Sequence, residues 1–296
     1  MNSFIGQQQA TGDLTFDVDE DLLALIRTAL LEDLRYGPDV TTLATVPADT
    51  VAEARFVSRQ HGVVAGLPVV RAVLDEVVGP DNYVVTEQLD DGSRVEPGSV
   101  ALAVRAPATS LLTAERTALN LLCHLSGIAT ATAAWVDAVD GTKAKIRDSR
   151  KTLPGLRSLQ KYAVRAGGGV NHRMGLGDAA LIKDNHVVAA GGVGKALEAV
   201  RAAAPDIPVE VEVDSLDQLD EVLALAPQLV LLDNFEPWAT QMAVTRRDAT
   251  SPETKLESSG GLTLDVAADY ARTGVDYLAV GALTHSVTVL DFGLDM

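Results

Sequence analysis

The chain has 296 residues, 47% of them hydrophobic, so it is long enough to bury the core of one large or two medium-sized domains. Its 24 Lys and Arg residues are outnumbered by 41 Asp and Glu residues. The resulting net charge of −17 excludes a general nucleic-acid or membrane-surface binder, because both need a broad basic face. Cys123 is the only cysteine, which excludes an internal disulfide and a cysteine-cluster metal site.

The N-terminal third of the chain predicts a small α+β domain. Residues 1–16 lack the basic start and apolar core of a secretion signal and are expected to form a flexible tail. With no apolar run near the roughly 18 residues of a membrane span, we expect a cytoplasmic protein. A helix is predicted at about 17–35, with acidic residues at its beginning that suit the helix dipole. Next come strands at 52–58, 83–88 and 99–105, and a helix at 110–123.

After about residue 125 the sequence alternates short apolar strands with amphipathic helices. The strands are predicted at 144–147, 179–183, 209–213, 229–233, 254–258 and 276–281, and two of the helices at 193–204 and 215–226. Regular alternation favours parallel strands joined by right-handed crossovers, in an open doubly wound sheet or a barrel. Because no GxGxxG motif follows the first strand, we predict an α/β barrel.

Polar side chains follow almost every predicted strand of this region. In a barrel, the residues at the carboxyl ends of the strands form the active site. Polar loops alone would explain some of these positions, but not an acid or a base after nearly every strand, so we predict that this end is catalytic. The residues are Arg147, Asp148, Lys183, Asp184, Glu212, Asp214, Asp233, Asn234, Glu257, Ser258 and Ser259.

Small residues after the last two strands predict a phosphate site. ESSGG at 257–261 and VGA at 280–282 would let backbone N–H groups approach a ligand closely. Either motif alone is equally well explained as a tight turn. Two such motifs on adjacent strand–helix units favour phosphate.

Carboxylates on two neighbouring strands predict a magnesium site. Glu210 and Glu212 lie on the same side of strand 209–213 because side chains alternate along a strand. Asp233 ends the next strand, and Glu212 with Asp233 offers the oxygen ligands that Mg²⁺ prefers. Glu210 is better explained as a counter-charge to nearby Lys and Arg. No serine or cysteine nucleophile lies beside these acids, so a covalent mechanism is not indicated.

Residues 148–186 hold seven Lys or Arg against three Asp, in contrast to the acidic remainder. Arg150 and Arg173 suit a planar carboxylated substrate, because arginine binds carboxylate through two parallel hydrogen bonds, whereas lysine better matches phosphate or pyrophosphate. A magnesium site, a phosphate site and a carboxylate site on one face predict transfer from a pyrophosphate-bearing sugar phosphate to a small acid. Three further basic residues recur at helical spacing and are interpreted as a solvated helix face, namely Arg157, Lys161 and Arg165.

The motifs in these segments resemble those of quinolinate phosphoribosyltransferases, the decarboxylating enzymes of NAD biosynthesis. The resemblance runs from EDLRYGPDVTT to the C-terminus and rests on TAERTALNLLCHLSGIAT, KIRDSRKTLPGLR, GGGVNHRMGLGDAALIKDNH, VEVEVDS, LLDNF, ESSGG and DYLAVGALTHS. It implies an N-terminal α/β sandwich plus an incomplete, seven-stranded TIM-like α/β barrel, assembled as a homodimer. We therefore expect a tail at 1–16, a sandwich domain at 17–124, a barrel at 125–284 and a C-terminal segment, 285–296, that packs back on the N-terminal domain.

The resemblance implies transfer of phosphoribosyl from 5-phosphoribosyl 1-pyrophosphate to quinolinate with decarboxylation, giving nicotinate mononucleotide, pyrophosphate and CO₂, with Mg²⁺ as cofactor. The nearest alternative is a transferase of the same fold that acts on nicotinate or another small acid. More distant alternatives are a barrel aldolase with Lys183 as a Schiff-base lysine and a non-catalytic anion-binding protein. The strand-end acids argue against the last of these.

The resemblance also implies roles for individual residues. Quinolinate would be bound by Arg116, Arg150, His172, Arg173 and Lys183. The catalytic residues would be Lys151, Glu212 and Asp233, the last two as metal ligands. Together with these three, the phosphoribosyl pyrophosphate site would comprise Ser149 (where the family usually has threonine), Ser259, Gly260, Gly261, Val280, Gly281 and Ala282.

Arg116 would reach the quinolinate site of the partner subunit in the homodimer that the resemblance implies. It shares one helix face with Asn120 and His124, since the three lie at i, i+4 and i+8. Spacing alone would favour a solvated surface stripe.

Overall fold

The structure is a computed structural model that describes residue 14 and residues 16–296, so nearly all of the expected tail lies outside the described residues. The described chain forms two compact units. Unit 1 comprises Ala134–Thr152 and Gly169–His285. Unit 2 comprises the chain from residue 14 to Ala133, together with Leu153–Gly168 and Ser286–Met296.

The division differs from the expected domain boundaries in two places. The chain passes from one unit to the other at residue 133 rather than 124, inside one continuous helix, α4 (Ala108–Ala138). Leu153–Gly168, expected in the barrel, packs with unit 2. The C-terminal segment joins unit 2, where β12 (Phe292–Asp295) pairs antiparallel with β1 (Val51–Ser58).

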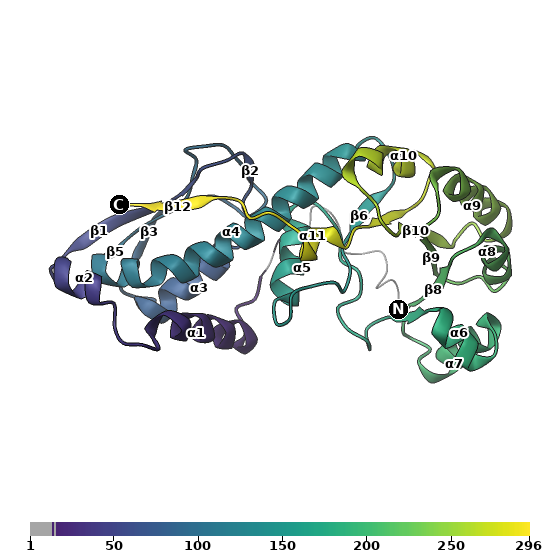
Figure 1. Cartoon of the computed structure of the whole chain (residues 1–296), viewed down its shortest axis with the longest axis horizontal. Helices are drawn as coiled ribbons and strands as arrows, with labels where there is room; N and C mark the ends of the chain where they lie inside the picture. Colours follow the sequence, from purple (N-terminus) through teal and green to yellow (C-terminus); the bar gives the residue numbers. More distant parts are fainter. Residues whose placement is uncertain (1–13, 15) are drawn as a thin grey trace. The chain divides into compact units, whose positions relative to one another are not determined.

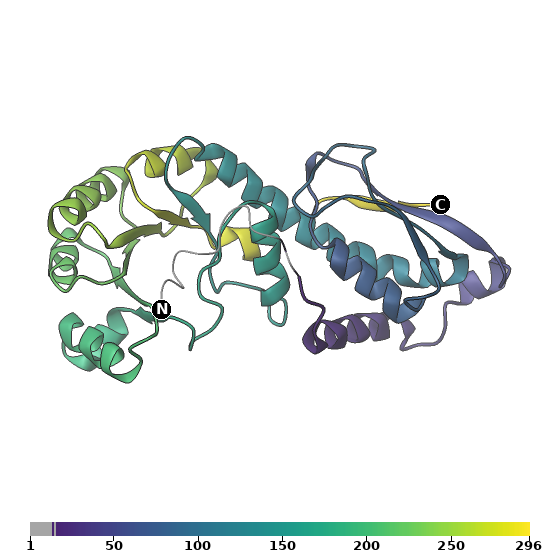
Figure 2. The same ribbon diagram turned by 180° about the vertical axis from the view of Figure 1, so that it is seen from behind.

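Unit 2 is built on a four-stranded antiparallel sheet in the order β12-β1-β5-β3, with α3 and α4 against one face (Figures 1 and 2). The predicted strands of this part are confirmed. The remaining elements of the unit are α1 (Glu20–Leu34), α2 (Val40–Thr45), β2 (Gly62–Val63), α3 (Leu67–Val77), β3 (Val84–Gln88), β4 (Arg94–Val95), β5 (Val100–Pro107) and α5 (Arg157–Ala166).

Helix α4 forms the centre of unit 2 and continues well past its predicted end near residue 123. Its residues from 124 to 138 include no proline, so nothing stops the helix. By length and composition α4 could cross a membrane, but 56% of its apolar window is buried inside the protein, as in a core helix. Gly127 lets the returning C-terminal segment approach closely, because a Cβ atom there would lie 2.9 Å from Cα of Val289.

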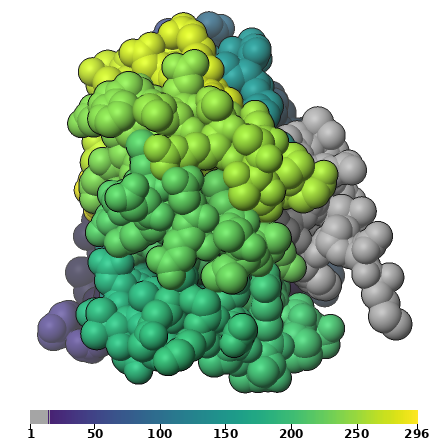
Figure 3. All heavy atoms as spheres, turned by 90° about the vertical axis from the view of Figure 1, so that its right-hand side faces the viewer, coloured from purple at the N-terminus to yellow at the C-terminus, as the bar shows by residue number. Residues whose placement is uncertain are grey.

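Unit 1 is built on a sheet of six parallel strands in the order β6-β11-β10-β9-β8-β7. The strands are β6 (Lys145–Arg147), β7 (Ala180–Ile182), β8 (Val209–Val213), β9 (Leu229–Asp233), β10 (Lys255–Ser259) and β11 (Tyr277–Ala279). The helices are α6 (Asp184–Ala190), α7 (Val193–Ala203), α8 (Leu216–Leu223), α9 (Pro237–Thr250), the 3-10 turn η1 (Leu264–Val266), α10 (Ala267–Arg272) and α11 (Ala282–His285). Figure 3 shows the side of unit 1 that lies at the right in Figure 1, where the atoms drawn in green form a closed surface.

The parallel sheet confirms the α/β class, and among the described residues it holds six strands rather than the expected seven. A single parallel bridge between Arg147 and Val170 marks the position of the missing strand, beside β6. Val170 follows three consecutive glycines, which weaken a strand because they lose much backbone freedom and pack no side chain.

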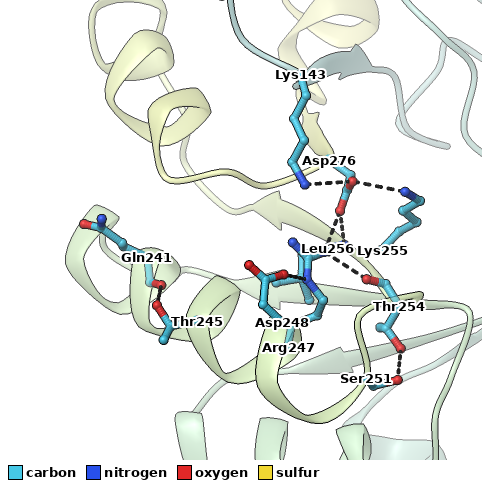
Figure 4. Close-up of polar contacts among 10 residues, drawn as sticks. All are labelled: Lys143, Gln241, Thr245, Arg247, Asp248, Ser251, Thr254, Lys255, Leu256 and Asp276. Atoms are coloured by element: carbon cyan, nitrogen blue, oxygen red, sulfur yellow. Dashed lines mark hydrogen bonds and ion pairs between the residues drawn. The ribbon is translucent and has the colours of Figure 1, made fainter.

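The amino-terminal end of the β10–β11 pair is held by the carboxylate of Asp276 (Figure 4). Its Oδ2 accepts hydrogen bonds from Arg247 Nη1 and from the backbone N–H of Leu256, each at 2.9 Å. Its Oδ1 lies 3.2 Å from Lys143 Nζ and 3.4 Å from Lys255 Nζ. Burial alone would raise the pKa of Asp276, but these donors outweigh burial and hold the pKa below its usual range. In barrels this end serves stability rather than chemistry.

We expect Asp276→Asn to lower the free energy of unfolding by about 3 kcal/mol near neutral pH, because the amide removes the buried carboxylate that pairs with Arg247 and leaves this arginine only the exposed carboxylate of Asp248. The folded pKa of Asp276 is depressed, so its contribution is present above the ordinary pKa and is lost as the pH falls through the folded value. The difference between variant and parent should therefore shrink in acid. Urea unfolding near neutral pH and near pH 3 measures both effects.

A matched control is Asp269→Asn, which breaks the exposed pair of Asp269 and Arg272. This variant should change the free energy of unfolding by less than about 0.5 kcal/mol. Equal losses in the Asp276 and Asp269 variants would contradict a special role for Asp276.

Candidate active site

The predicted site residues of unit 1 all lie at the carboxyl end of its parallel sheet. Each follows a strand or lies at its end, and neighbouring parallel strands end at the same edge. They are Ser149, Arg150 and Lys151 after β6; His172 and Arg173 after the Val170 bridge; Lys183 after β7; Glu212 in β8; Asp233 in β9; Ser259, Gly260 and Gly261 at the end of β10; and Val280, Gly281 and Ala282 after β11. Arg116 belongs to unit 2.

Two arginines of the predicted carboxylate site lie close enough to repel each other. The pKa of Arg173 is lowered first by burial and then by the positive charge of Arg150. Arg173 Nη1 donates to the carbonyl of Ala179 at 3.0 Å, which fixes the plane of the guanidinium. Within the described part of the chain, the buried Nε of Arg150 has no hydrogen-bond partner. Two planar cations that interact, one of them with a buried donor still unused, form a site suited to carboxylates.

Lys151 lies against the loop that follows β11. Thr284 Oγ1 donates to the carbonyl of Lys151 at 2.9 Å. A Cβ atom on Gly281 would lie 2.9 Å from Cδ of Lys151, so glycine leaves room there for the lysine side chain. Lys151 is therefore placed beside one of the two predicted phosphate loops. In the other loop, Gly260 and Gly261 have φ values of 96° and 58°, in the left-handed region that favours glycine.

Lys183 and Glu212, expected at the carboxylates and at the metal respectively, form an ion pair in the structure. Glu212 and Asp233 are both half-buried and lie on the adjacent strands β8 and β9. Their carboxylate oxygens are hard donors, and a Mg²⁺ ion with few protein ligands keeps several waters. The donor set therefore fits magnesium, with Lys183 as a neighbouring cation for phosphate oxygens.

A buried ion pair lies in the interior of the sheet. Arg147 Nη1 lies 2.6 Å from Glu257 Oε2, and its guanidinium lies 4.8 Å from the ring centroid of Tyr277. Burial raises the pKa of Glu257, and it raises the pKa of Glu210 to about 7. Burial also opposes the charge on Arg147, but the carboxylates of Glu257 and Glu210 outweigh it and raise the pKa of Arg147. Arg147 therefore stays charged and is the counter-charge of both acids.

His172, expected to bind quinolinate, is directed toward these acids. Its side chain is 8% exposed, and its Nε2 lies 2.9 Å from Glu210 Oε2. The backbone N–H of Arg173 donates to Nδ1 at 2.7 Å, so Nδ1 carries no hydrogen and Nε2–H donates to Glu210. His172 thus links the buried acids to the backbone that carries Arg173.

Within the described part of the chain, His172, Glu210 and Glu257 also form the one group of three or more His, Cys, Asp or Glu residues with ligand atoms close enough for a metal ion, all within 4.8 Å of one another. Arg147 already balances Glu257, and His172 presents an N–H group rather than a lone pair to Glu210. The group is therefore a polar core held together by an ion pair and a hydrogen bond rather than a metal centre. The sequence predicts Glu257 only as a strand-end acid, and its mostly polar strand, KLESS, carries no local signal of its burial.

The interpretation of Arg157, Lys161 and Arg165 as a solvated helix face is wrong for Lys161, which is 1% exposed. Neighbouring residues on several sides of α5, from Leu159 to Val164, are buried, so most of this helix is enclosed. Helical spacing identifies a shared face but does not reveal whether that face meets solvent.

Arg116, Asn120 and His124 share one face of α4, as predicted. The Arg116 side chain is 64% exposed within this chain, and Asn120 is exposed as well. His124 is half-buried and its Nε2 lies 2.9 Å from the amide nitrogen of Gln160, and burial lowers the pKa of His124. The Arg116 end of this face is therefore open for a contact outside the chain.

The chain matches two family models, described as the N-terminal domain of quinolinate phosphoribosyl transferase over residues 39–126 and its C-terminal domain over residues 128–295. The chain belongs to the quinolinate phosphoribosyl transferase family. The carboxylating nicotinate-nucleotide pyrophosphorylase of Mycobacterium leprae is 66% identical over 284 residues, which are 96% of this chain and 99% of that relative. The human protein of the same name is 38% identical over 278 residues, with 93% of this chain and 91% of the relative covered.

Solved structures of the family confirm the fold class. The nicotinate-nucleotide pyrophosphorylase of Francisella tularensis superposes with a TM-score of 0.89 at 35% identity, covering 96% of this chain and 99% of that chain. The protein of that name from Ehrlichia chaffeensis gives a TM-score of 0.86 at 34% identity, covering 95% and 99%. The resemblance identified from the sequence motifs is thereby confirmed.

Proposed function

We propose that the protein transfers the phosphoribosyl group of 5-phosphoribosyl 1-pyrophosphate to quinolinate with decarboxylation, yielding nicotinate mononucleotide, pyrophosphate and CO₂. The observation that carries this proposal is that the guanidiniums of Arg150 and Arg173 lie near enough to interact electrostatically, with a buried donor of Arg150 unused. Quinolinate has two neighbouring carboxylates, and two planar forks in one site match them. Membership of the family, and the names of relatives up to 66% identical, support the same reaction.

The second substrate would lie across the ends of β8 to β11. Its 5′-phosphate would take backbone N–H groups from the loops that begin at Ser259 and Val280. Lys151, beside the second of these loops, would hold the pyrophosphate. Glu212 and Asp233 would hold a magnesium ion directly or through waters, and that ion would neutralise charge on the pyrophosphate.

The chemistry needs position and charge more than proton transfer. A bond forms from the pyridine nitrogen to the anomeric carbon while the bond from that carbon to pyrophosphate breaks, and the electron pair leaves with the pyrophosphate oxygen. Lys151 would stabilise the leaving charge. The positively charged ring then accepts the electrons of the adjacent carbon–carboxylate bond as CO₂ departs, and a proton from solvent replaces it. Arg150 and Arg173 would hold the carboxylates while this occurs.

The test is a product assay with quinolinate, 5-phosphoribosyl 1-pyrophosphate and Mg²⁺. We expect nicotinate mononucleotide, pyrophosphate and CO₂ in equal amounts, and loss of turnover when a chelator removes the metal. Nicotinate would leave one guanidinium unpaired at a cost of about 1–3 kcal/mol, so we expect it to be used at least about fivefold less well. Faster use of nicotinate, without CO₂ release, would establish the alternative function.

We also propose that the protein is a cytoplasmic homodimer, without nucleic-acid or membrane partners, in which Arg116 serves the quinolinate site of the partner subunit. The exposure of Arg116 supports this assignment. Large apolar side chains exposed in and around α1 and α2 offer a surface for a second copy. They include Leu31 at 58%, Tyr36 at 91%, Val40 at 72% and Leu43 at 63% exposure. The acidic composition supports the absence of nucleic-acid and membrane partners.

A further inference from the structure

Asn234, the residue after Asp233, has a left-handed backbone with φ of 57°. Among the described residues other than glycine, only Ala226, with φ of 47°, shares a positive φ. Such a backbone is costly for most L-residues, and asparagine tolerates it better because its short side chain bonds locally. Residues held in this way concentrate at functional sites, so the side chain of Asn234 and its surroundings are informative.

Two hydrogen bonds connect Asn234 to both neighbouring strand ends. Its side-chain Nδ2 donates to Asp233 Oδ2 at 2.9 Å. Its backbone N–H donates to the carbonyl of Ser259 at 2.9 Å. The first bond orients the carboxylate of Asp233, and the second ties the end of β9 to the start of the loop after β10.

Gly260 packs directly on the side chain of Asn234. A Cβ atom on Gly260 would overlap Oδ1 of Asn234 and lie 2.6 Å from its Cγ and 2.9 Å from its backbone nitrogen. The Asn234 amide therefore fills the space that a side chain at position 260 would need. Gly260 also has a left-handed φ of 96°, so glycine suits position 260 both for its backbone conformation and for its contact with Asn234.

We propose that Asn234 is a positioning residue that sets the Asp233 carboxylate against the Ser259–Gly261 loop, so that 5-phosphoribosyl 1-pyrophosphate and its magnesium meet both groups in register. The inference rests on the proposed function of Asp233 and of this loop. Asn234 acts through Asp233 and Gly260 and makes no contact with the reacting atoms. Its contribution is to one substrate only, because the carboxylate site of Arg150 and Arg173 lies after other strands.

The test compares Asn234→Gly with the parent. Glycine keeps the left-handed backbone but loses the amide that holds Asp233. Removing a hydrogen bond to a charged group should weaken binding of 5-phosphoribosyl 1-pyrophosphate in the presence of Mg²⁺ by about tenfold or more. Binding of quinolinate should change by less than about twofold. Calorimetric titration with each ligand separately measures both constants, and KM for each substrate should divide in the same way.

Two further variants separate positioning from general damage. Ala226→Gly relaxes the other left-handed non-glycine residue, at the amino-terminal side of β9, and should leave both binding constants unchanged. Gly260→Ala should weaken phosphoribosyl pyrophosphate binding, and adding Asn234→Gly should make it less harmful, because the two nearest obstacles to the Cβ atom, Oδ1 and Cγ of Asn234, are then absent.

The inference would be overturned if a folded Asn234→Gly variant binds 5-phosphoribosyl 1-pyrophosphate as tightly as the parent does. It would also be overturned if the variant binds both ligands more weakly by the same factor. If the losses of binding free energy in Gly260→Ala and Asn234→Gly simply add in the double variant, the proposed interlock, in which Gly260 packs against the Asn234 amide, would be overturned. A parent protein that binds 5-phosphoribosyl 1-pyrophosphate but does not use quinolinate would refute the proposed function instead, and the binding comparison would still decide the role of Asn234.

Discussion

Arg173→Lys is expected to lower kcat/KM for quinolinate on the order of 100-fold, because a lysine keeps the charge but loses the planar fork. The KM for 5-phosphoribosyl 1-pyrophosphate should change by less than about twofold. The guanidinium plane of Arg173 is fixed by its bond to the carbonyl of Ala179, so its remaining donors have a set direction that an ammonium group cannot reproduce. Initial rates measured with each substrate varied in turn provide both constants.

Arg201→Lys is the matched control for this prediction. Arg201 also donates to backbone carbonyls, those of Leu225 and Ala226, but it lies on α7 and contacts the amino-terminal side of β9. Its replacement should leave both kinetic constants unchanged. If the Arg173 variant uses quinolinate as efficiently as the parent does, Arg173 has no place in the carboxylate site.

The fold of unit 1 could be predicted from the sequence because its signals are local. The strands VEVEV and LVLLD were predicted at 209–213 and 229–233, the bounds that β8 and β9 have. LVLLD is a nearly continuous apolar run, as is typical of parallel strands covered on both faces, and VEVEV combines β-branched residues with strict alternation; each is followed by a helix. The collection of polar residues at one end followed from the parallel arrangement alone.

The burial of charged side chains could not be predicted from the sequence, because it depends on contacts between segments far apart in the chain. Glu257 is buried because its strand register places it beside Tyr277, which in turn lies beside Lys145, and this brings Glu257 to Arg147. The sequence around Glu257 or around Arg147 does not reveal this ion pair, since about a hundred residues separate the two along the chain. Lys161 was misinterpreted for a similar reason, because the spacing within α5 says nothing about what encloses the helix.

Asn234 illustrates an intermediate case. An asparagine after a strand is a recognisable candidate for a left-handed turn. Its bond to Asp233 is local, and the dipeptide alone makes that bond possible. Its interlock with Gly260 depends on the pairing of β9 with β10, where Asp233 lies opposite Ser259. Only the structure reveals that the two predicted sites, for metal and for phosphate, share this contact.

Mixing two inactive variants, Arg116→Ala and Lys151→Ala, is expected to restore about a quarter of the parent activity after dissociation and reassembly. Arg116 lies in unit 2 and Lys151 in unit 1, so the two lesions are on different parts of the chain. In the proposed dimer, each site combines Lys151 of one subunit with Arg116 of the other. Random pairing makes about half of the dimers mixed, and each mixed dimer has one intact site.

A mixture of Arg173→Ala and Lys151→Ala is the control, because both residues lie in unit 1. Every site in its mixed dimers keeps one lesion, so no activity should return. Subunit exchange is verified by isolating mixed dimers that carry two different affinity tags. If Arg116 served its own subunit, each site in the first mixture would also keep a lesion. Mixed dimers of the Arg116 and Lys151 variants that remain inactive would therefore refute the shared site, whereas recovery confined to that mixture requires Arg116 to act across the interface.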